Sequence, residues 1–138
     1  AYIEGWAVYA TEMMLDEGYL DKSPELRLTF LKQQLRMIAN AILDIRLQTL
    51  GMTDEQALKL MIEDTFQEKE EATAKLQRAK LTSTQLPTYF VGYYGWRTVR
   101  DAYKQATGAG FSLPEFHQKA LRVGPVPLDE LGKMLTAR

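Results

Sequence analysis

Apolar residues recur along most of the chain at intervals of three and four, which is the spacing of one face of an α-helix. The first such run consists of Ile3, Ala7, Ala10 and Met14. Gly18 and Pro24 then interrupt the pattern, so we expect a first helix that ends near Gly18. The chain does not begin with Met and its helical pattern is already present at residue 2, which indicates a fragment of a longer protein.

A second and much longer run follows. Ser23 can cap a helix there, and Pro24 suits its first turn because the missing N–H is not needed at that position. The apolar stripe comprises Leu28, Leu31, Leu35, Ile38, Ile42, Ile45 and Thr49. It continues until Gly51, so it predicts a helix of roughly 27 residues and about 40 Å, long enough to serve as a scaffold.

Helix start and stop signals divide the rest of the chain. Thr53 and Gln56 form a capping-box pattern that opens a third helix, and this helix runs toward the charged tract at 66–81. Charges of both signs alternate in that tract, which is typical of a solvated helix face.

Three more helices are predicted. One lies between Pro87 and Gly108, one between Ser112 and Gly124, and the last begins at Pro127. No segment shows the alternation of a strand and no repeat is visible, so the sequence predicts an all-α fold of about six helices, including one long scaffold helix.

Composition limits the class of protein. The 138 residues, 46% of them apolar, suffice for one hydrophobic core, so we expect a single helical domain over residues 1–138. The net charge is −1 and the basic residues are spread along the chain, which excludes an obvious nucleic-acid surface. No apolar run is long enough to cross a membrane, and any export signal is expected upstream, so the compartment stays unknown.

The usual catalytic motifs are absent. We find no phosphate-binding loop, nucleophile elbow or dinucleotide fingerprint. The chain has no cysteine and one histidine, His117, so the usual zinc ligands cannot complete a site within it.

Four segments change this picture when they are taken together. In order they are "EGWAVYATE", "LDIRLQTLGMTDEQAL", "TYFVGYYGW" and "FHQKALRVGPVPLDEL". They span essentially the whole chain. Through these segments the chain resembles the bacterial domain-of-unknown-function family 885, whose members look like gluzincin-type zinc peptidases. The resemblance implies that the chain is the C-terminal part of a larger helical metallopeptidase-like fold.

The resemblance also implies a metal ligand. An upstream helix of the His-Glu-x-x-His kind would supply two zinc ligands and the general base, and Glu4 in the "EGWAVYATE" segment would be the third ligand. A zinc carboxylate ligand needs a rigid element, which a helix provides. The alternative is a Glu that only interacts with the positive end of its own helix. Because the other ligands lie upstream, no zinc is expected in this chain alone.

Other positions follow from the same resemblance. Tyr89 and Tyr93 are candidate catalytic residues that donate a hydrogen bond to an oxyanion, with aromatic packing as the alternative. Arg46, Gln48 and His117 are candidate substrate-binding residues. The family frequently has a His where this chain has Gln48, and Gln cannot carry a proton at neutral pH. Arg46 would hold a carboxylate, with Asp44 as a local partner, and His117 has packing as its alternative.

Two hypotheses about function remain at this point. The first is the C-terminal part of a zinc-dependent peptidase or hydrolase that binds a peptide-like substrate together with a missing N-terminal half and is inactive alone. The second is a non-catalytic helical module for protein interaction or oligomerisation. Removal of an N-terminal half would expose apolar surface around Ile3, Trp6, Tyr89 and Tyr93, through which the chain could form a homo-oligomer.

Overall fold

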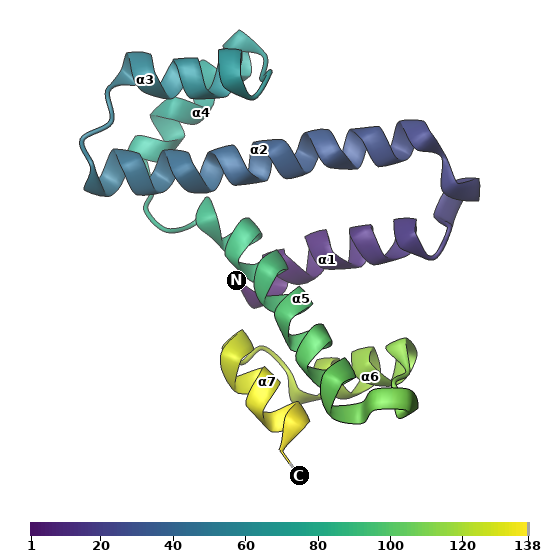
Figure 1. The fold of residues 1–138 in the computed structure, drawn as a ribbon. Coiled ribbons are helices and arrows are strands. Elements are labelled where there is room, and N and C mark those ends of the chain that lie inside the picture. Colours follow the sequence, from purple (N-terminus) through teal and green to yellow (C-terminus); the bar gives the residue numbers. More distant parts are fainter. Residues whose placement is uncertain (138) are drawn as a thin grey trace. The chain divides into compact units, whose positions relative to one another are not determined.

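The computed structural model describes residues 1–137, which are helical over most of their length and contain no strand (Figure 1). The elements are α1 (Tyr2–Asp16), η1 (Tyr19–Lys22), α2 (Pro24–Thr49), α3 (Asp54–Lys59), η2 (Leu60–Asp64), α4 (Lys69–Leu81), α5 (Pro87–Thr107), η3 (Gly108–Gly110), α6 (Leu113–Val123) and α7 (Leu128–Thr136). The prediction of an all-α fold with one long helix is confirmed.

The chain divides into two compact units, which we describe separately. Unit 1 combines Ala1–Thr11 with the chain from Val91 onward, and unit 2 is Glu12–Phe90. Helices α1 and α5 each begin in one unit and end in the other. The expectation of a single domain stays a prediction.

The predicted helix starts are confirmed at three caps. The Ser23 hydroxyl accepts a hydrogen bond from the Leu26 N–H at the start of α2. Thr53 and Gln56 form the reciprocal capping box of α3, and the Ser112 hydroxyl caps α6. These caps satisfy N–H groups that have no partner within their own helix.

One predicted helix is two helices in the structure. The third helix was expected to run from Thr53 toward the charged tract, but α3 ends at Lys59, a π-helical turn follows, and α4 begins at Lys69. Thr65 lies in the interruption and its hydroxyl donates back to the Leu60 and Met61 carbonyls. Carbonyls of the first two residues of the turn are thus bonded by a side chain, which allows the chain to leave the helix.

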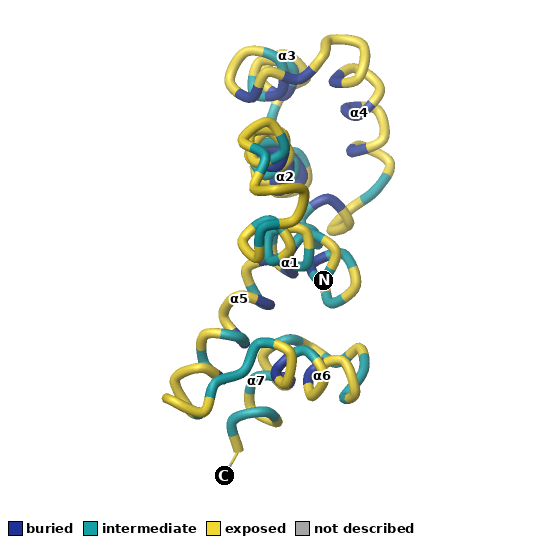
Figure 2. The backbone as a smooth tube through the Cα atoms, turned by 90° about the vertical axis from the view of Figure 1, so that its right-hand side faces the viewer, coloured by how far each residue is buried: buried dark blue, intermediate teal, exposed yellow. Residues whose placement is uncertain are grey.

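The core of unit 2 lies where α2, α3 and α4 meet, at the C-terminal half of α2 (Figure 1). Its buried residues are Leu43, Ala57, Met61, Ala72, Leu76, Ala79 and Leu86. Figure 2 shows buried positions recurring along α4, as expected for a helix with one packed face.

The apolar stripe that predicts α2 is not its buried face. Leu28, Leu31 and Ile45 are exposed by 68%, 51% and 51%. The buried residues of the helix are Phe30, Met37, Ala39, Ala41, Leu43 and Asp44. Positions 30, 37, 41 and 44 also have helical spacing, so the helix carries two possible apolar faces and spacing alone cannot choose between them.

The apolar spacing that predicts α1 does not mark its packed face either. Ile3 is 73% exposed and Met14 is 43% exposed, whereas Gly5 and Tyr9 are buried. Gly5 lies against Gly92 of α5, so closely that a methyl group on Gly5 would stand 2.1 Å from the Gly92 carbonyl carbon. The contact face of α1 is therefore the face with a glycine, which a search for large apolar side chains overlooks.

The buried residues of unit 1 are mostly aromatic. They include Tyr9, Tyr93, Trp96, Val99, Tyr103, Phe116, Ala120 and Leu131. Within the described residues, no helix is both long enough and apolar enough to cross a membrane.

Candidate functional site

The most distinctive arrangement in unit 1 is a group of aromatic rings around His117. Trp6 and Tyr9 of α1, Trp96 of α5 and Phe116 of α6 form this group, which we call the aromatic cluster. The Trp6 and Trp96 ring centroids are 4.9 Å apart, and the His117 ring stands edge-on to Trp6 at 5.3 Å. Edge-on and tilted contacts between rings favour particular orientations, in addition to the stabilisation from apolar burial. The His117 ring is therefore held in place.

The close approach of two helices makes this cluster possible. Because Gly5 and Gly92 lack side chains, the backbones of α1 and α5 can touch, and the Trp6 and Trp96 rings beside them pack against each other at a tilt of 59°. The Trp96 indole N–H donates a hydrogen bond of 2.9 Å to the Tyr2 carbonyl in the first turn of α1. The first turn of α1 is therefore fixed to α5.

His117 is hydrogen-bonded within the cluster. Its Nε2 lies 2.9 Å from the Tyr9 hydroxyl, and Tyr9 has no exposed surface. Partial burial lowers the pKa of His117, and the nearby Arg100 guanidinium lowers it further. The imidazole is therefore neutral at pH 7. Sequence analysis did not select Tyr9, although its spacing of three from Trp6 places both on one helix face.

Glu4 lies in the first turn of α1 and is half-buried. Its carboxylate makes no hydrogen bond and no ion pair with any residue that the structure describes. At 100° per residue, Glu4 is about 140° around the helix from Tyr9. Helix α1 therefore carries Glu4 on one face and, on another, Tyr9, which is hydrogen-bonded to His117.

The two candidate tyrosines belong to different units. Tyr93 is in unit 1 and is only 6% exposed, and its hydroxyl accepts a hydrogen bond of 3.0 Å from the Arg97 guanidinium. Because Tyr93 is buried, it is not part of an exposed apolar surface, contrary to expectation. Tyr89 is half-buried in the first turn of α5 and belongs to unit 2.

Gln48 and Arg46 lie near the C-terminal end of α2, in unit 2. The Gln48 amide donates to the Ala79 and Thr82 carbonyls, at 2.9 and 3.0 Å, so it fastens α2 to the end of α4. Arg46 is exposed and borders a shallow pocket that also includes Lys59 and Asp64. Asp64 is paired with Lys59 at 3.2 Å.

The expected pairing of Asp44 with Arg46 is wrong. Asp44 is 3% exposed, and its Oδ2 accepts a hydrogen bond of 3.1 Å from the Thr84 N–H. Its Oδ1 is buried and has no partner among residues 1–137, and Arg46 forms no ion pair within the same range. Two residues apart on the same helix, and so on nearly opposite sides of it, Arg46 faces solvent while Asp44 faces the segment that joins α4 to α5.

These residues do not form a metal site by themselves. No group of three His, Cys, Asp or Glu side chains that could hold a metal ion occurs in the described part of the chain. A structural or catalytic zinc needs at least three protein ligands. The described residues therefore do not make up a zinc site on their own.

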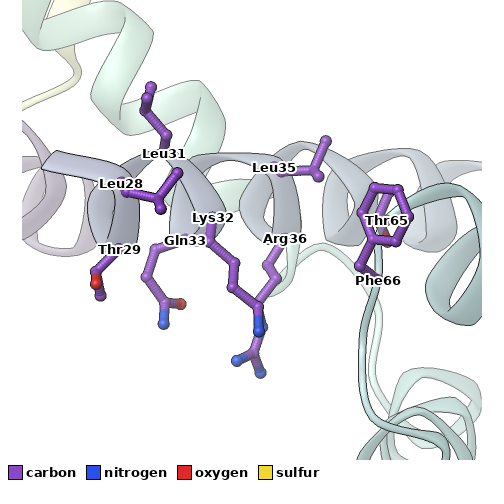
Figure 3. Close-up of a pocket in the computed structure, with 9 residues that line it drawn as sticks. All are labelled: Leu28, Thr29, Leu31, Lys32, Gln33, Leu35, Arg36, Thr65 and Phe66. Atoms are coloured by element: carbon purple, nitrogen blue, oxygen red, sulfur yellow. The ribbon is translucent and has the colours of Figure 1, made fainter. Parts of the chain in front are cut away.

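A second feature is a groove of about 770 Å³ beside α2 in unit 2. Figure 3 shows Lys32 and Arg36 extending from α2 on the same side, with Phe66 near the end of the row. Phe66 is 70% exposed, and Leu28 and Leu31 on α2 are also exposed. Large apolar side chains that are exposed to solvent in a group are typical of a surface that contacts another protein segment.

Comparison with known proteins places the chain in a family. A model of the family described as "Bacterial protein of unknown function (DUF885)" matches residues 1–135. The chain belongs to this family. No match was found among the curated proteins.

A solved structure has the same fold as this DUF885 chain. It is described as "a putative lipoprotein of unknown function" from Shewanella oneidensis, with 42% sequence identity and a TM-score of 0.92. The match covers 97% of the DUF885 chain described here and 24% of the solved chain. This chain therefore spans about a quarter of the length of that relative.

Proposed function

We propose that this chain is the C-terminal helical part of a zinc-dependent peptidase or hydrolase, in which Glu4 is one metal ligand. The zinc site would be complete only in a longer protein, as the family resemblance implies. In it, the N-terminal segments of the longer protein supply the other zinc ligands and the opposite wall of the substrate cleft.

The observation that carries the proposal is the state of the Glu4 carboxylate. It is half-buried on the first turn of α1 and makes no hydrogen bond or ion pair within residues 1–137. A partly buried carboxylate without a partner is costly, and a divalent cation compensates its charge well. The first turn is also rigid, since Gly5 packs against Gly92 and the Trp96 N–H bonds to the Tyr2 carbonyl. Rigidity of this kind is what a ligand position requires.

In this proposal Tyr93 is a catalytic residue, His117 and Arg46 bind substrate, and Gln48 has a structural role. His117, held in the aromatic cluster, contacts a peptide-like substrate, and Tyr93, whose hydroxyl is fixed by Arg97, donates to a carbonyl oxygen. Gln48 has both N–H groups on main-chain carbonyls, which supports a structural role for it. Arg46 is exposed and remains available for a carboxylate.

The test uses the full-length protein encoded by the gene. Zinc content after dialysis and hydrolysis of a casein-derived peptide mixture are measured for the wild type, Glu4→Gln and the control Glu17→Gln, which changes an exposed carboxylate outside α1. We expect Glu4→Gln to lose zinc and most turnover, and Glu17→Gln to keep both. Full zinc and full turnover in Glu4→Gln would contradict the proposal.

The groove on α2 supports a second candidate function, a module for protein interaction. Leu28, Leu31 and Phe66 present apolar surface, and Lys32 has no ion pair within the described residues. A helix with apolar residues on one face and carboxylates at its edge would fit this groove. Replacing Leu28 and Leu31 by Glu should abolish self-association in sedimentation experiments if the groove binds a second copy, and should leave it unchanged if it does not.

A further inference from the structure

We infer that Tyr9 is a positioning residue that holds the imidazole of His117 as an Nδ1–H hydrogen-bond donor for an uncharged carbonyl oxygen of a ligand. The inference rests on the proposed function only in that His117 contacts the substrate. The hydrogen bond between the two side chains is a separate feature of unit 1 and can be tested without any metal.

The chemistry of the two groups favours one direction for this hydrogen bond. Tyr9 has no exposed surface, and its hydroxyl lies 2.9 Å from His117 Nε2. A phenol hydroxyl is a good donor and its oxygen a weak acceptor, whereas an unprotonated imidazole nitrogen is a good acceptor. The favoured arrangement therefore has Tyr9 donating to Nε2, which leaves the ring proton on Nδ1.

The surroundings keep the ring neutral. Arg100 of α5, whose guanidinium lies 5.7 Å from the Tyr9 ring centre, acts on the ring electrostatically, and α6 itself carries Lys119 two residues after His117. Lys119 pairs with Glu115 and Arg100 with Asp101. Arg100 and burial both disfavour the imidazolium form, so His117 offers one N–H rather than two.

The other ring nitrogen is not used within the described part of the chain. His117 is only partly buried, and its Nδ1 has no hydrogen-bond partner among residues 1–137. Trp6 stands edge-on to the ring at 5.3 Å and Phe116 lies 5.4 Å from it. A single neutral donor bordered by apolar rings suits the carbonyl of an amide better than a charged group.

Nuclear magnetic resonance can test the inference because the chain has one histidine. Long-range ¹H–¹⁵N spectra of the ¹⁵N-labelled chain at neutral pH distinguish a protonated from an unprotonated ring nitrogen. We expect Nδ1 to be protonated in the wild type and the population to move toward the Nε2–H form in Tyr9→Phe, which keeps the ring but removes the hydroxyl. Predominance of Nε2–H in the wild type would overturn the inference.

Tyr2→Phe is the matched control. Tyr2 is on the same helix and contacts Trp96, but its hydroxyl is directed at the Ala120 carbonyl, 3.4 Å away. The tautomer should be unchanged in this variant. An equal change in both variants would mean that loosening of the aromatic cluster, and not the Tyr9 hydroxyl, sets the tautomer, and would overturn the inference.

The ligand class is tested with N-methylacetamide as the probe. Its addition should shift the Nδ1–H resonance of the wild type downfield, whereas sodium acetate at the same concentration should shift it less. Equal or larger shifts with acetate, or no shift with the amide, would overturn the assignment of a carbonyl ligand. Loss of zinc in Glu4→Gln of the full-length protein, by contrast, tests the proposed function and leaves this result untouched.

Discussion

Gly5 and Gly92 touch where α1 meets α5 in unit 1. A Cβ on Gly92 would lie 2.7 Å from the Gly5 Cα and 2.1 Å from the Ala1 carbonyl oxygen. Backbone atoms surround both positions, so no side chain can turn away to make room. This contact fixes the first turn of α1, and with it Glu4 on one face and Trp6 and Tyr9 on another.

Gly92→Ala should therefore destabilise the chain. Overpacking costs about 1–3 kcal/mol and more where the obstacle is backbone, so we expect a loss at or above the top of that range. Chemical denaturation measures it. Gly110→Ala is the control, since nothing lies within 4 Å of a Cβ there, and it should change stability little. Equal stability of Gly92→Ala and wild type would show that α1 does not pack in this way.

The hydrogen bond of Asp44 gives a second prediction. Asp44→Ala removes the acceptor of the Thr84 N–H and should cost about 1–3 kcal/mol, the range for a polar group that loses its partner in a buried place. Arg46→Ala should be close to neutral, because Arg46 is exposed. Thermal melting of the two variants measures both effects. Equal losses would instead indicate that Asp44 and Arg46 form a pair.

The lowered pKa of Lys75 predicts that stability depends on pH. Burial, and then the charges of Arg36 and Arg78, lower its pKa from 10.5 to about 8. Between these values the unfolded chain binds a proton that the folded chain does not, so this group makes stability rise with pH from about 8 to 10.5.

The variant Lys75→Met should lack this rise. The free energy of unfolding is measured at several pH values for the wild type, Lys75→Met and Lys80→Met, which changes a more exposed lysine of the same helix. Above pH 8, the free energy of unfolding of the wild type should increase relative to that of Lys75→Met. The curve of Lys80→Met should follow the wild type. Parallel curves for all three would contradict the lowered pKa.

The isolated chain should bind no zinc tightly and hydrolyse no peptide. One carboxylate, Glu4, cannot replace the three ligands of a zinc site, and no group of three potential ligands occurs in the described residues. Metal analysis after dialysis against a weak chelator measures this directly. Zinc retained in a one-to-one ratio would show that the chain holds a complete site.

The helix starts could be predicted from the sequence because they depend on neighbours. The Ser23, Thr53 and Ser112 caps bond to N–H groups three residues away, so the signal and its effect lie in the same turn. The end of α3 was missed because the interruption depends on the Thr65 hydroxyl reaching back to the Leu60 and Met61 carbonyls. Thr11 and Thr73 make the same kind of bond inside uninterrupted helices, so a Thr alone does not indicate a break.

The faces of the helices were less predictable. Helix α2 has apolar residues on most of its surface, and only contact with α3 and α4 decides that Leu43 is buried while Ile45 is exposed. The bond between Tyr9 and His117 joins residues 108 positions apart, so no local pattern could indicate it. Glu4 was selected through the family resemblance alone, and its role as a ligand stays a prediction.

The most direct test of that role is a crystal structure of the full-length protein with zinc, using anomalous scattering at the zinc absorption edge. If Glu4 is a ligand, one anomalous peak will lie about 2.0–2.2 Å from a Glu4 carboxylate oxygen, the distance of a zinc–carboxylate bond. A zinc peak bound by other residues, with the Glu4 carboxylate out of bonding distance, would contradict that role.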